Sequence, residues 1–114
     1  MAKAYVPDIG EVVWLQFAPQ AGHEQAGLRP ALVLTPAAYN GKTGLMLCCP
    51  MTSQIKGYPF EVRINNNPKV AGAILADQVK SLDWRARKAR RFARISDAEV
   101  AEVRGKLKAL IGIV

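Results

Sequence analysis

The chain has 114 residues, of which half are hydrophobic, and it carries a formal net charge of +7. This length predicts one domain, residues 1–114, that buries roughly two thirds of the surface exposed by its unfolded chain and needs neither a metal nor a disulfide to fold. No apolar run approaches the roughly 20 residues of a membrane span, and the first residues lack the apolar stretch of a signal peptide, so we expect a cytoplasmic protein without a membrane segment.

Short strand-like segments separated by turn residues fill the first eighty positions. The expected strands are 11–17, 31–35, 44–49, 60–64 and 73–79. Asn40-Gly41 and residues 65–68 read as turns, and Pro36, Pro50 and Pro59 bracket strands. This spacing predicts a mainly β fold, either a small barrel or a sandwich.

A polar loop, residues 22–30, follows the first strand and holds the only histidine, His23, together with Glu24 and Arg29. Loops held between rigid strands are favoured places for binding and catalytic residues. We therefore expect any chemistry to centre on this loop.

Two adjacent cysteines, Cys48 and Cys49, lie within an apolar segment. Neighbouring side chains of a strand point to opposite faces, which disfavours a disulfide between these two or a zinc ion shared by them. We expect both to have a structural role.

A strongly basic run covers residues 85–94, which include no acidic residue. Its six cationic residues are Arg85, Arg87, Lys88, Arg90, Arg91 and Arg94. Such density suits a polyanion, either a nucleic acid or an acidic protein segment. The alternative is a solvated basic face without a specific partner, and the sequence does not decide between them.

One helix is expected at the end of the chain. Ser96 and Glu99 have the spacing of a capping box, and Gly112 is a natural stop. Apolar residues recur at helical spacing and predict a stripe that packs on the β domain. These residues are Val100, Val103, Leu107, Leu110 and Ile111.

Several motifs, in this order and spacing, resemble the MazF and PemK family of toxin endoribonucleases over residues 5–112. They are the entry to the first strand (5–10), the loop Glu-Gln-Ala-Gly-Leu-Arg-Pro (24–30) and the loop Pro-Met-Thr-Ser-Gln (50–54). Residues 56–62 and 76–87 are similar to the MazF branch in particular.

This resemblance implies an SH3-like β-barrel with a C-terminal helix, a homodimer, and metal-independent cleavage of single-stranded RNA at short sequences. In this family the ribose 2′-hydroxyl acts as nucleophile, which leaves a 2′,3′-cyclic phosphate and a 5′-hydroxyl, so no cofactor or metal is expected. The acidic residues are accordingly scattered, at Asp8, Glu11, Glu24, Glu61, Asp77 and Asp83. The implied partner besides RNA is an antitoxin whose acidic, disordered tail covers the active groove.

By resemblance, Arg29 and Thr52 are the main catalytic residues. A guanidinium matches phosphate oxygens and stabilises the charge that develops in the transition state, whereas its high pKa makes it a reluctant proton donor. The Thr52 hydroxyl, with Ser53 beside it, is suited to hold the same phosphate in place.

The general base stays open between Glu24 and His23. A carboxylate of ordinary pKa is a weak base, and histidine is chemically better suited. A histidine here is similar to the PemK branch, but that branch has an arginine where this chain has Leu75. The departure puts a wholesale transfer of the PemK mechanism in doubt.

Aromatic and amide groups near the two loops are candidates for RNA recognition, because unpaired bases stack on rings and are read along their edges. Besides Ser53, the candidates are Phe17, Gln25, Gln54, Lys56, Tyr58 and Gln78. Core or dimer packing is the alternative for Phe17 and Tyr58. Trp14 is expected in the core, and Trp84 is expected to pack beneath the basic run.

Two rival functions use the same fold. One is a non-catalytic gyrase poison of the CcdB type, which carries a terminal Trp-Gly-Ile signature, whereas this chain ends Ile-Gly-Ile-Val. The other is an inactive RNA-binding module, against which the presence of Arg29 and Thr52 argues.

Overall fold

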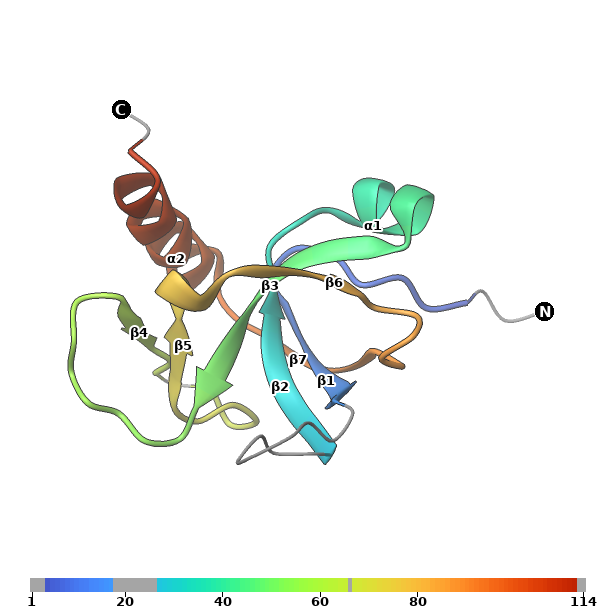
Figure 1. Cartoon of the computed structure of the whole chain (residues 1–114). Coiled ribbons are helices and arrows are strands. Elements are labelled where there is room, and N and C mark those ends of the chain that lie inside the picture. The colour runs from blue at the N-terminus through green and yellow to red at the C-terminus, as the bar shows by residue number, and fades with distance from the viewer. Residues whose placement is uncertain (1–3, 18–26, 66, 113–114) are drawn as a thin grey trace, which may run out of the picture.

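The computed structural model describes residues 4–17, 27–65 and 67–112 (Figure 1). Their elements in chain order are β1 (Glu11–Phe17), β2 (Gly27–Val33), α1 (Ala37–Thr43), β3 (Leu45–Thr52), β4 (Glu61–Arg63), β5 (Ala73–Leu75), the 3₁₀ helix η1 (Ala76–Gln78), β6 (Lys80–Asp83), β7 (Arg90–Arg94) and α2 (Asp97–Leu110).

The strands form one antiparallel sheet in the order β4-β5-β3-β2-β1-β7, and β6 pairs with β3. α2 contacts η1 and β4, and α1 lies beside β3 at the other end of the molecule (Figure 1). The predicted mainly β class with a C-terminal helix is confirmed. Within the described residues, however, the end strands β4 and β7 do not pair, so the SH3-like sheet is open and not a closed barrel.

Two apolar clusters form the core, as the alternation along the strands requires. Val12 and Cys49 belong to one cluster, and Val13, Cys48 and Trp84 belong to the other. Both cysteines are buried and free, as expected. Burial raises the pKa of Cys48 to about 11 and that of Cys49 to about 12, so neither thiol ionises at neutral pH.

Strands β2 and β3 extend further than the sequence predicted, because prolines did not end them. β2 begins at Gly27, where 31 was expected, and β3 runs to Thr52, where 49 was expected. Pro30 is opposite Trp14 of β1, at a place where β2 no longer pairs with β3, so its missing N–H costs no bond to β3. Pro50 lies within β3 opposite Ala31. These extensions place Arg29 and Thr52 within strands, near their ends.

The Asn40-Gly41 turn was a wrong prediction, because these residues lie inside the helix α1. Pro36 is its N-cap, and Gly44, with a φ of 76°, is its left-handed C-cap. The buried Asn40 side chain donates to the carbonyl oxygens of Pro7 and Thr35, which fixes the helix against the chain entry. An amide that satisfies distant carbonyls is indistinguishable in sequence from a turn residue.

The strand predicted for 73–79 is also shorter, because the chain bends through η1 after Leu75 and continues as β6. Part of the basic run forms a strand that was not predicted, β7, which pairs with β1. Trp84 is buried and donates its indole N–H to the Asn40 carbonyl at 2.9 Å, so its predicted packing role is confirmed.

Helix α2 has the predicted capping box: Ser96 Oγ accepts from the Glu99 N–H, and the Glu99 carboxylate accepts from the Ser96 N–H. Val100 and Val103 are buried, but Leu110 and Ile111 are 44% and 61% exposed. The predicted stripe therefore packs only over its N-terminal part, because the last turn extends beyond the sheet (Figure 1).

Trp14 is not in the core, contrary to the prediction. It is half-buried and stacks on Phe92 of β7, with ring centroids 4.6 Å apart. The bulge between Val12 and Val13 in the β1–β7 register lies just before it. An aromatic residue within an apolar strand gives no sign of such a bulge.

Candidate functional site

Arg29 and Thr52 lie on antiparallel neighbours, β2 and β3. The two strands pair from Val33–Cys48 to Ala31–Pro50. Beyond that point Thr52 pairs with Ala73 of β5, so the ends of β2 and β3 that carry Arg29 and Thr52 are not paired with each other. Residues that are 23 positions apart in the sequence thus face one cavity between the strand ends.

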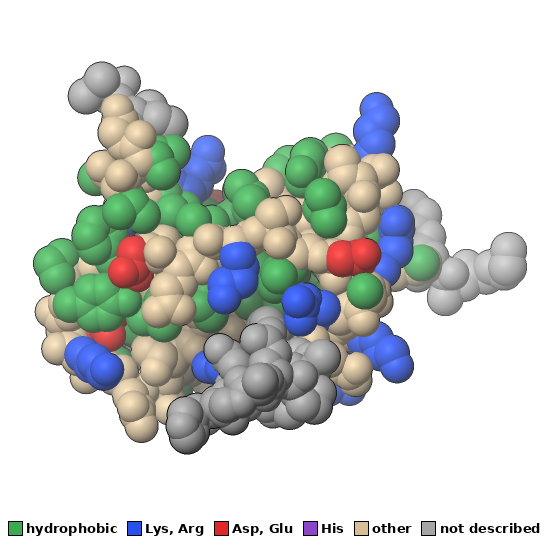
Figure 2. All heavy atoms as spheres, viewed as in Figure 1, with side chains coloured by type: hydrophobic (Ala, Val, Ile, Leu, Met, Phe, Trp, Pro, Cys, Tyr) green, Lys and Arg blue, Asp and Glu red, His purple; other side chains and the backbone are tan. Residues whose placement is uncertain are grey.

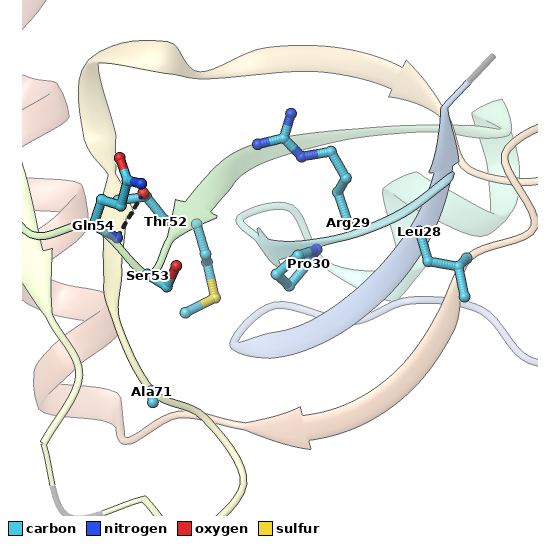
Figure 3. A pocket seen from close by; sticks show the side chains of 8 residues that line it. Leu28, Arg29, Pro30, Thr52, Ser53, Gln54 and Ala71 are labelled. Carbon is cyan, nitrogen blue, oxygen red and sulfur yellow. Dashed lines mark hydrogen bonds between the residues drawn. The ribbon is translucent and has the colours of Figure 1, made fainter. Parts of the chain in front are cut away.

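Both residues line a pocket of about 480 Å³ at the ends of these strands, within the roughly 300–1,000 Å³ of ordinary ligand sites. Its lining comprises Leu28, Arg29, Pro30, Met51, Thr52, Ser53, Gln54 and Ala71. In Figure 3 the Arg29 guanidinium extends towards the segment that carries Thr52 and Gln54. We call this cavity the arginine pocket.

A smaller pocket of about 180 Å³ adjoins it and shares Thr52 and Gln54 with it. Its other lining residues are Lys56, Tyr58, Glu61, Leu75 and Gln78. We call it the tyrosine pocket. The structure therefore gathers seven of the predicted site residues around two adjoining cavities: Arg29, Thr52, Ser53, Gln54, Lys56, Tyr58 and Gln78.

The remaining predicted site residues are not placed. His23, Glu24 and Gln25 lie outside the described residues, and so does the side chain of Phe17. The alternative to a catalytic role for Arg29 is an ordinary surface ion pair with Glu24, and this pair also lies outside the described residues. Among the residues that the structure describes, no carboxylate forms an ion pair with Arg29, which is half-buried.

The Thr52 hydroxyl is held by the backbone. Its oxygen accepts a hydrogen bond from the Gln54 N–H at 3.1 Å, the dashed line in Figure 3. This bond uses a lone pair of the oxygen and not the hydroxyl hydrogen, so the hydrogen can still be donated to a ligand in the arginine pocket. A hydroxyl anchored in this manner loses little freedom when it binds.

Glu61 lines the tyrosine pocket and was not among the predicted site residues. Its carboxylate is 8% exposed and accepts from the backbone N–H of Lys56 at 3.1 Å and of Gly57 at 2.7 Å. These bonds fix the loop that carries the tyrosine pocket. The available signal was an acidic residue flanked by Phe60 and Val62 in an expected strand, because a buried carboxylate needs several donors.

Asp77 was likewise not recognised as part of the site. The hydroxyl of Tyr58, which lines the tyrosine pocket, donates to Asp77 Oδ1 at 2.9 Å. Desolvation and this hydrogen bond raise the pKa of Tyr58, so its phenol stays protonated. The pair fixes the orientation of the ring, which no local pattern of sequence could indicate.

Gly72 is a third missed residue. Its φ is +113°, and a Cβ atom at this position would lie 2.2 Å from the Thr52 carbonyl oxygen. Only glycine allows this close approach of the chain to the end of β3. Gly72 thereby sets the position of Thr52.

The described residues include no group of three or more histidine, cysteine or acidic side chains that could hold a metal ion. In the same ranges, no helix is both long and apolar enough to cross a membrane. Figure 2 shows Lys and Arg side chains spread over this face with few acidic ones among them, in line with the net charge of +7.

Comparison with known proteins decides the family. Residues 8–111 match the family model described as PemK-like, MazF-like toxin of type II toxin-antitoxin system. The chain belongs to this family of toxins. It is similar to the endoribonuclease toxin MazF of Escherichia coli K12, with 49% identity over 98% of this chain and 100% of the relative. It is also 34% identical to the endoribonuclease PemK of Escherichia coli, over 90% of this chain and 80% of PemK.

A solved structure supports the same family assignment. The MazE-MazF complex of Deinococcus radiodurans contains a chain with 59% identity and a TM-score of 0.91, which covers 97% of this chain and 100% of that one. The predicted family resemblance, closest to the MazF branch, is confirmed by these relatives.

Proposed function

We propose that this toxin, with residues 1–114 as one domain, is an endoribonuclease that cuts single-stranded RNA at short sequences without a metal ion. The ribose 2′-hydroxyl attacks the adjacent phosphorus, the bond to the 5′ oxygen breaks, and the products carry a 2′,3′-cyclic phosphate and a 5′-hydroxyl. The observation that carries the proposal is that Arg29 and Thr52 line one pocket.

Arg29 stabilises charge. As the 2′-oxygen adds, negative charge grows on the non-bridging oxygens of the phosphate, and a guanidinium in the pocket donates to these oxygens through its fork of N–H groups. Neither of the ion pairs found within the described residues involves Arg29. Arg29 acts as an acid only secondarily, since its pKa lies far above neutrality.

Thr52 and Ser53 orient the phosphate. The Thr52 hydroxyl, whose oxygen is already bonded to the Gln54 N–H, donates its hydrogen to a phosphate oxygen. Thr52 and Ser53 line the same pocket, across from the Arg29 side chain (Figure 3). Fixing the phosphate in this way aligns it with the 2′-oxygen for in-line attack.

Glu24 or His23 accepts the 2′-hydroxyl proton. Both belong to the segment that leads into β2, only a few positions before Arg29. Replacing each by glutamine separates them: removal of the base abolishes the acidic limb of the pH profile of kcat/KM, whereas removal of the other residue shifts it little.

The tyrosine pocket recognises an unpaired base. The Gln54 and Gln78 amides offer donors and acceptors for a base edge, the Tyr58 ring offers a stacking surface, and Lys56 adds charge for a phosphate. Gln25 and Phe17 are proposed to complete recognition from the 17–27 segment.

The partners follow from the family. A related MazF is found in a MazE-MazF complex, and we propose a corresponding antitoxin whose acidic, disordered tail covers the RNA groove. The active form is a homodimer, typical of the family, and it acts on RNA in the cytoplasm.

The decisive experiment treats a long single-stranded RNA with the protein in excess EDTA and maps the new 5′ ends. We expect discrete cuts with 5′-hydroxyl ends, abolished in Arg29→Ala and retained in the control Arg63→Ala, which removes an exposed arginine from β4. No cleavage by a folded protein that still binds RNA would refute the enzymatic proposal in favour of a binding module. Absence of both cleavage and RNA binding would favour a gyrase-directed toxin.

A further inference from the structure

A second groove lies apart from the two pockets of the site. Its volume is about 460 Å³, and it runs between residues 91–94 of β7 and the turn 67–69. Neither the expected site residues nor the family motifs include it. We call it the β7 groove.

The turn that forms one wall is fixed by Asn67. The Asn67 Oδ1 accepts from the N–H groups of Lys69 and Val70 at 2.9 and 3.2 Å, and its Nδ2 donates to the Arg94 carbonyl at 3.0 Å. The side chain thus shapes the turn and ties it to β7. The groove has a defined width in the absence of any ligand.

The groove is positively charged. Lys69 lies on one wall and Arg91 and Arg94 on the other. Arg94 is engaged by Asp97 at 3.3 Å, and Arg91 lies 3.6 Å from Glu11 with half of its side chain exposed. In the described part of the chain, the Lys69 ammonium has neither an ion pair nor a hydrogen bond. At least one full positive charge is therefore available to an anion.

An aromatic pair links the groove to the arginine pocket. Phe92 lines the groove and stacks on the half-exposed Trp14, which is directly opposite Pro30 of the arginine pocket and therefore on the same sheet face. From the other side, Ala71 lines the arginine pocket and Lys69 lines the groove. Two residues span at most about 7 Å, so the two cavities are near neighbours.

We infer that the β7 groove binds the RNA chain outside the cleaved motif, with one phosphate on Lys69, a second on Arg91 and an unpaired base against the Trp14–Phe92 pair. This inference rests on the proposed function. Rings bordered by cations are the combination that holds single-stranded nucleic acid without reading its sequence. An acidic peptide needs the charges alone and gains nothing specific from a stacked aromatic pair, so RNA is the occupant that the groove fits better.

The test compares two RNAs that contain the mapped cleavage sequence, one without flanks and one with flanks on both sides. A 2′-deoxy nucleotide at the cleaved position removes the nucleophile, so binding is measured without turnover. The variant is Lys69→Gln/Arg91→Gln. The matched control is Arg104→Gln/Lys108→Gln, which removes the same charge from exposed positions of α2.

We expect the groove variant to bind the flanked RNA at least fivefold more weakly than the control does, and the short RNA equally well. For two lost phosphate contacts, the slope of log affinity against log salt on the flanked RNA falls by about 1.4. Loss of Arg91 also removes its ion pair with Glu11, so the single variant Lys69→Gln is tested as well. This variant alone is expected to lower the slope of log affinity against log salt by about 0.7.

Equal affinities and slopes for the groove variant and its control would overturn the inference. Weaker binding of a poly-glutamate peptide with unchanged binding of the flanked RNA would assign the groove to an acidic peptide and also overturn it. These results are distinct from failure of the proposed function, in which the wild-type protein cleaves neither RNA in its all-ribose form.

Discussion

Replacing Gly72 by alanine tests how closely the site depends on the position of Thr52. The new Cβ atom would lie 2.2 Å from the Thr52 carbonyl oxygen, whereas real Cβ contacts are essentially never below 3.0 Å, so the two segments must separate by at least 0.8 Å. A φ of +113° adds strain of about 1–3 kcal/mol for any residue with a Cβ atom. A displacement near 1 Å at a group that orients the reacting phosphate can cost about 100-fold in rate.

We therefore expect Gly72→Ala to lower kcat by about 10- to 100-fold, with a smaller change in KM, and to lower the melting temperature by several degrees. The control is Gly112→Ala, which has a φ of +75° but no atom within 4 Å of the added Cβ, and which lies after α2 away from the site. Rates come from cleavage of a short fluorogenic RNA, and folding is checked by circular dichroism. A folded Gly72→Ala protein with the wild-type kcat would show that Thr52 need not be held where β3 places it.

Three further changes test the surroundings of the site and the core. Glu61→Gln weakens the hydrogen bonds to the Lys56 and Gly57 N–H groups by about 1 kcal/mol, so it should raise KM several-fold at an almost constant kcat. The control is Glu102→Gln, at an exposed position of α2, and equal KM values for the two variants would contradict the role of Glu61. Tyr58→Phe and Asp77→Asn should each weaken RNA binding about two- to tenfold, because each change acts on the same hydrogen bond. The double variant should lose no more affinity than either single variant. Additive losses would show that the hydrogen bond does not contribute to binding. Because the pKa of Cys48 in the folded state is raised to about 11, its thiol stays protonated in the folded protein at a pH where it ionises in the unfolded chain. From about pH 9 to 11, the free energy of unfolding of the wild-type protein should therefore fall by about 1.4 kcal/mol per pH unit more than that of Cys48→Ala, as measured by urea titration. Parallel pH profiles of the two proteins would refute this.

The parts of the fold that were predictable are those in which local signals agree with tertiary structure. Ser96 and Glu99 form the expected capping box, because both partners lie within one turn of the chain. Strand β1 has the predicted bounds, because its apolar residues are buried on both faces of the sheet. The helix α1 was missed because Asn40, a typical turn residue, is satisfied by the nearby Thr35 carbonyl and by the Pro7 carbonyl, which is 33 residues away in sequence.

In the candidate site too, some residues could be predicted from local sequence motifs and others could not. Arg29 and Thr52 were named from their motifs, and the antiparallel arrangement of β2 and β3, which no single motif contains, places both on one pocket. The supporting residues could not be found in this manner. Glu61 acts through backbone amides, and Gly72 acts through an absent Cβ atom, so neither shows a chemical signature in a sequence read one segment at a time.

The basic run shows why a total of charges is a poor guide to function. Arg85 donates to the Gly41 carbonyl at 3.2 Å, and Arg94 bridges the Ile9 carbonyl and Asp97, so these two guanidiniums hold segments of the fold together. Arg91 of the same run keeps half of its side chain exposed and lines the β7 groove together with Lys69, whose ammonium group has no hydrogen bond or ion pair within the described residues. A charge already committed to a hydrogen bond gives little to a new anion, because the old bond must be lost first. The position of each cation relative to a cavity therefore says more about anion binding than the number of charges in the run.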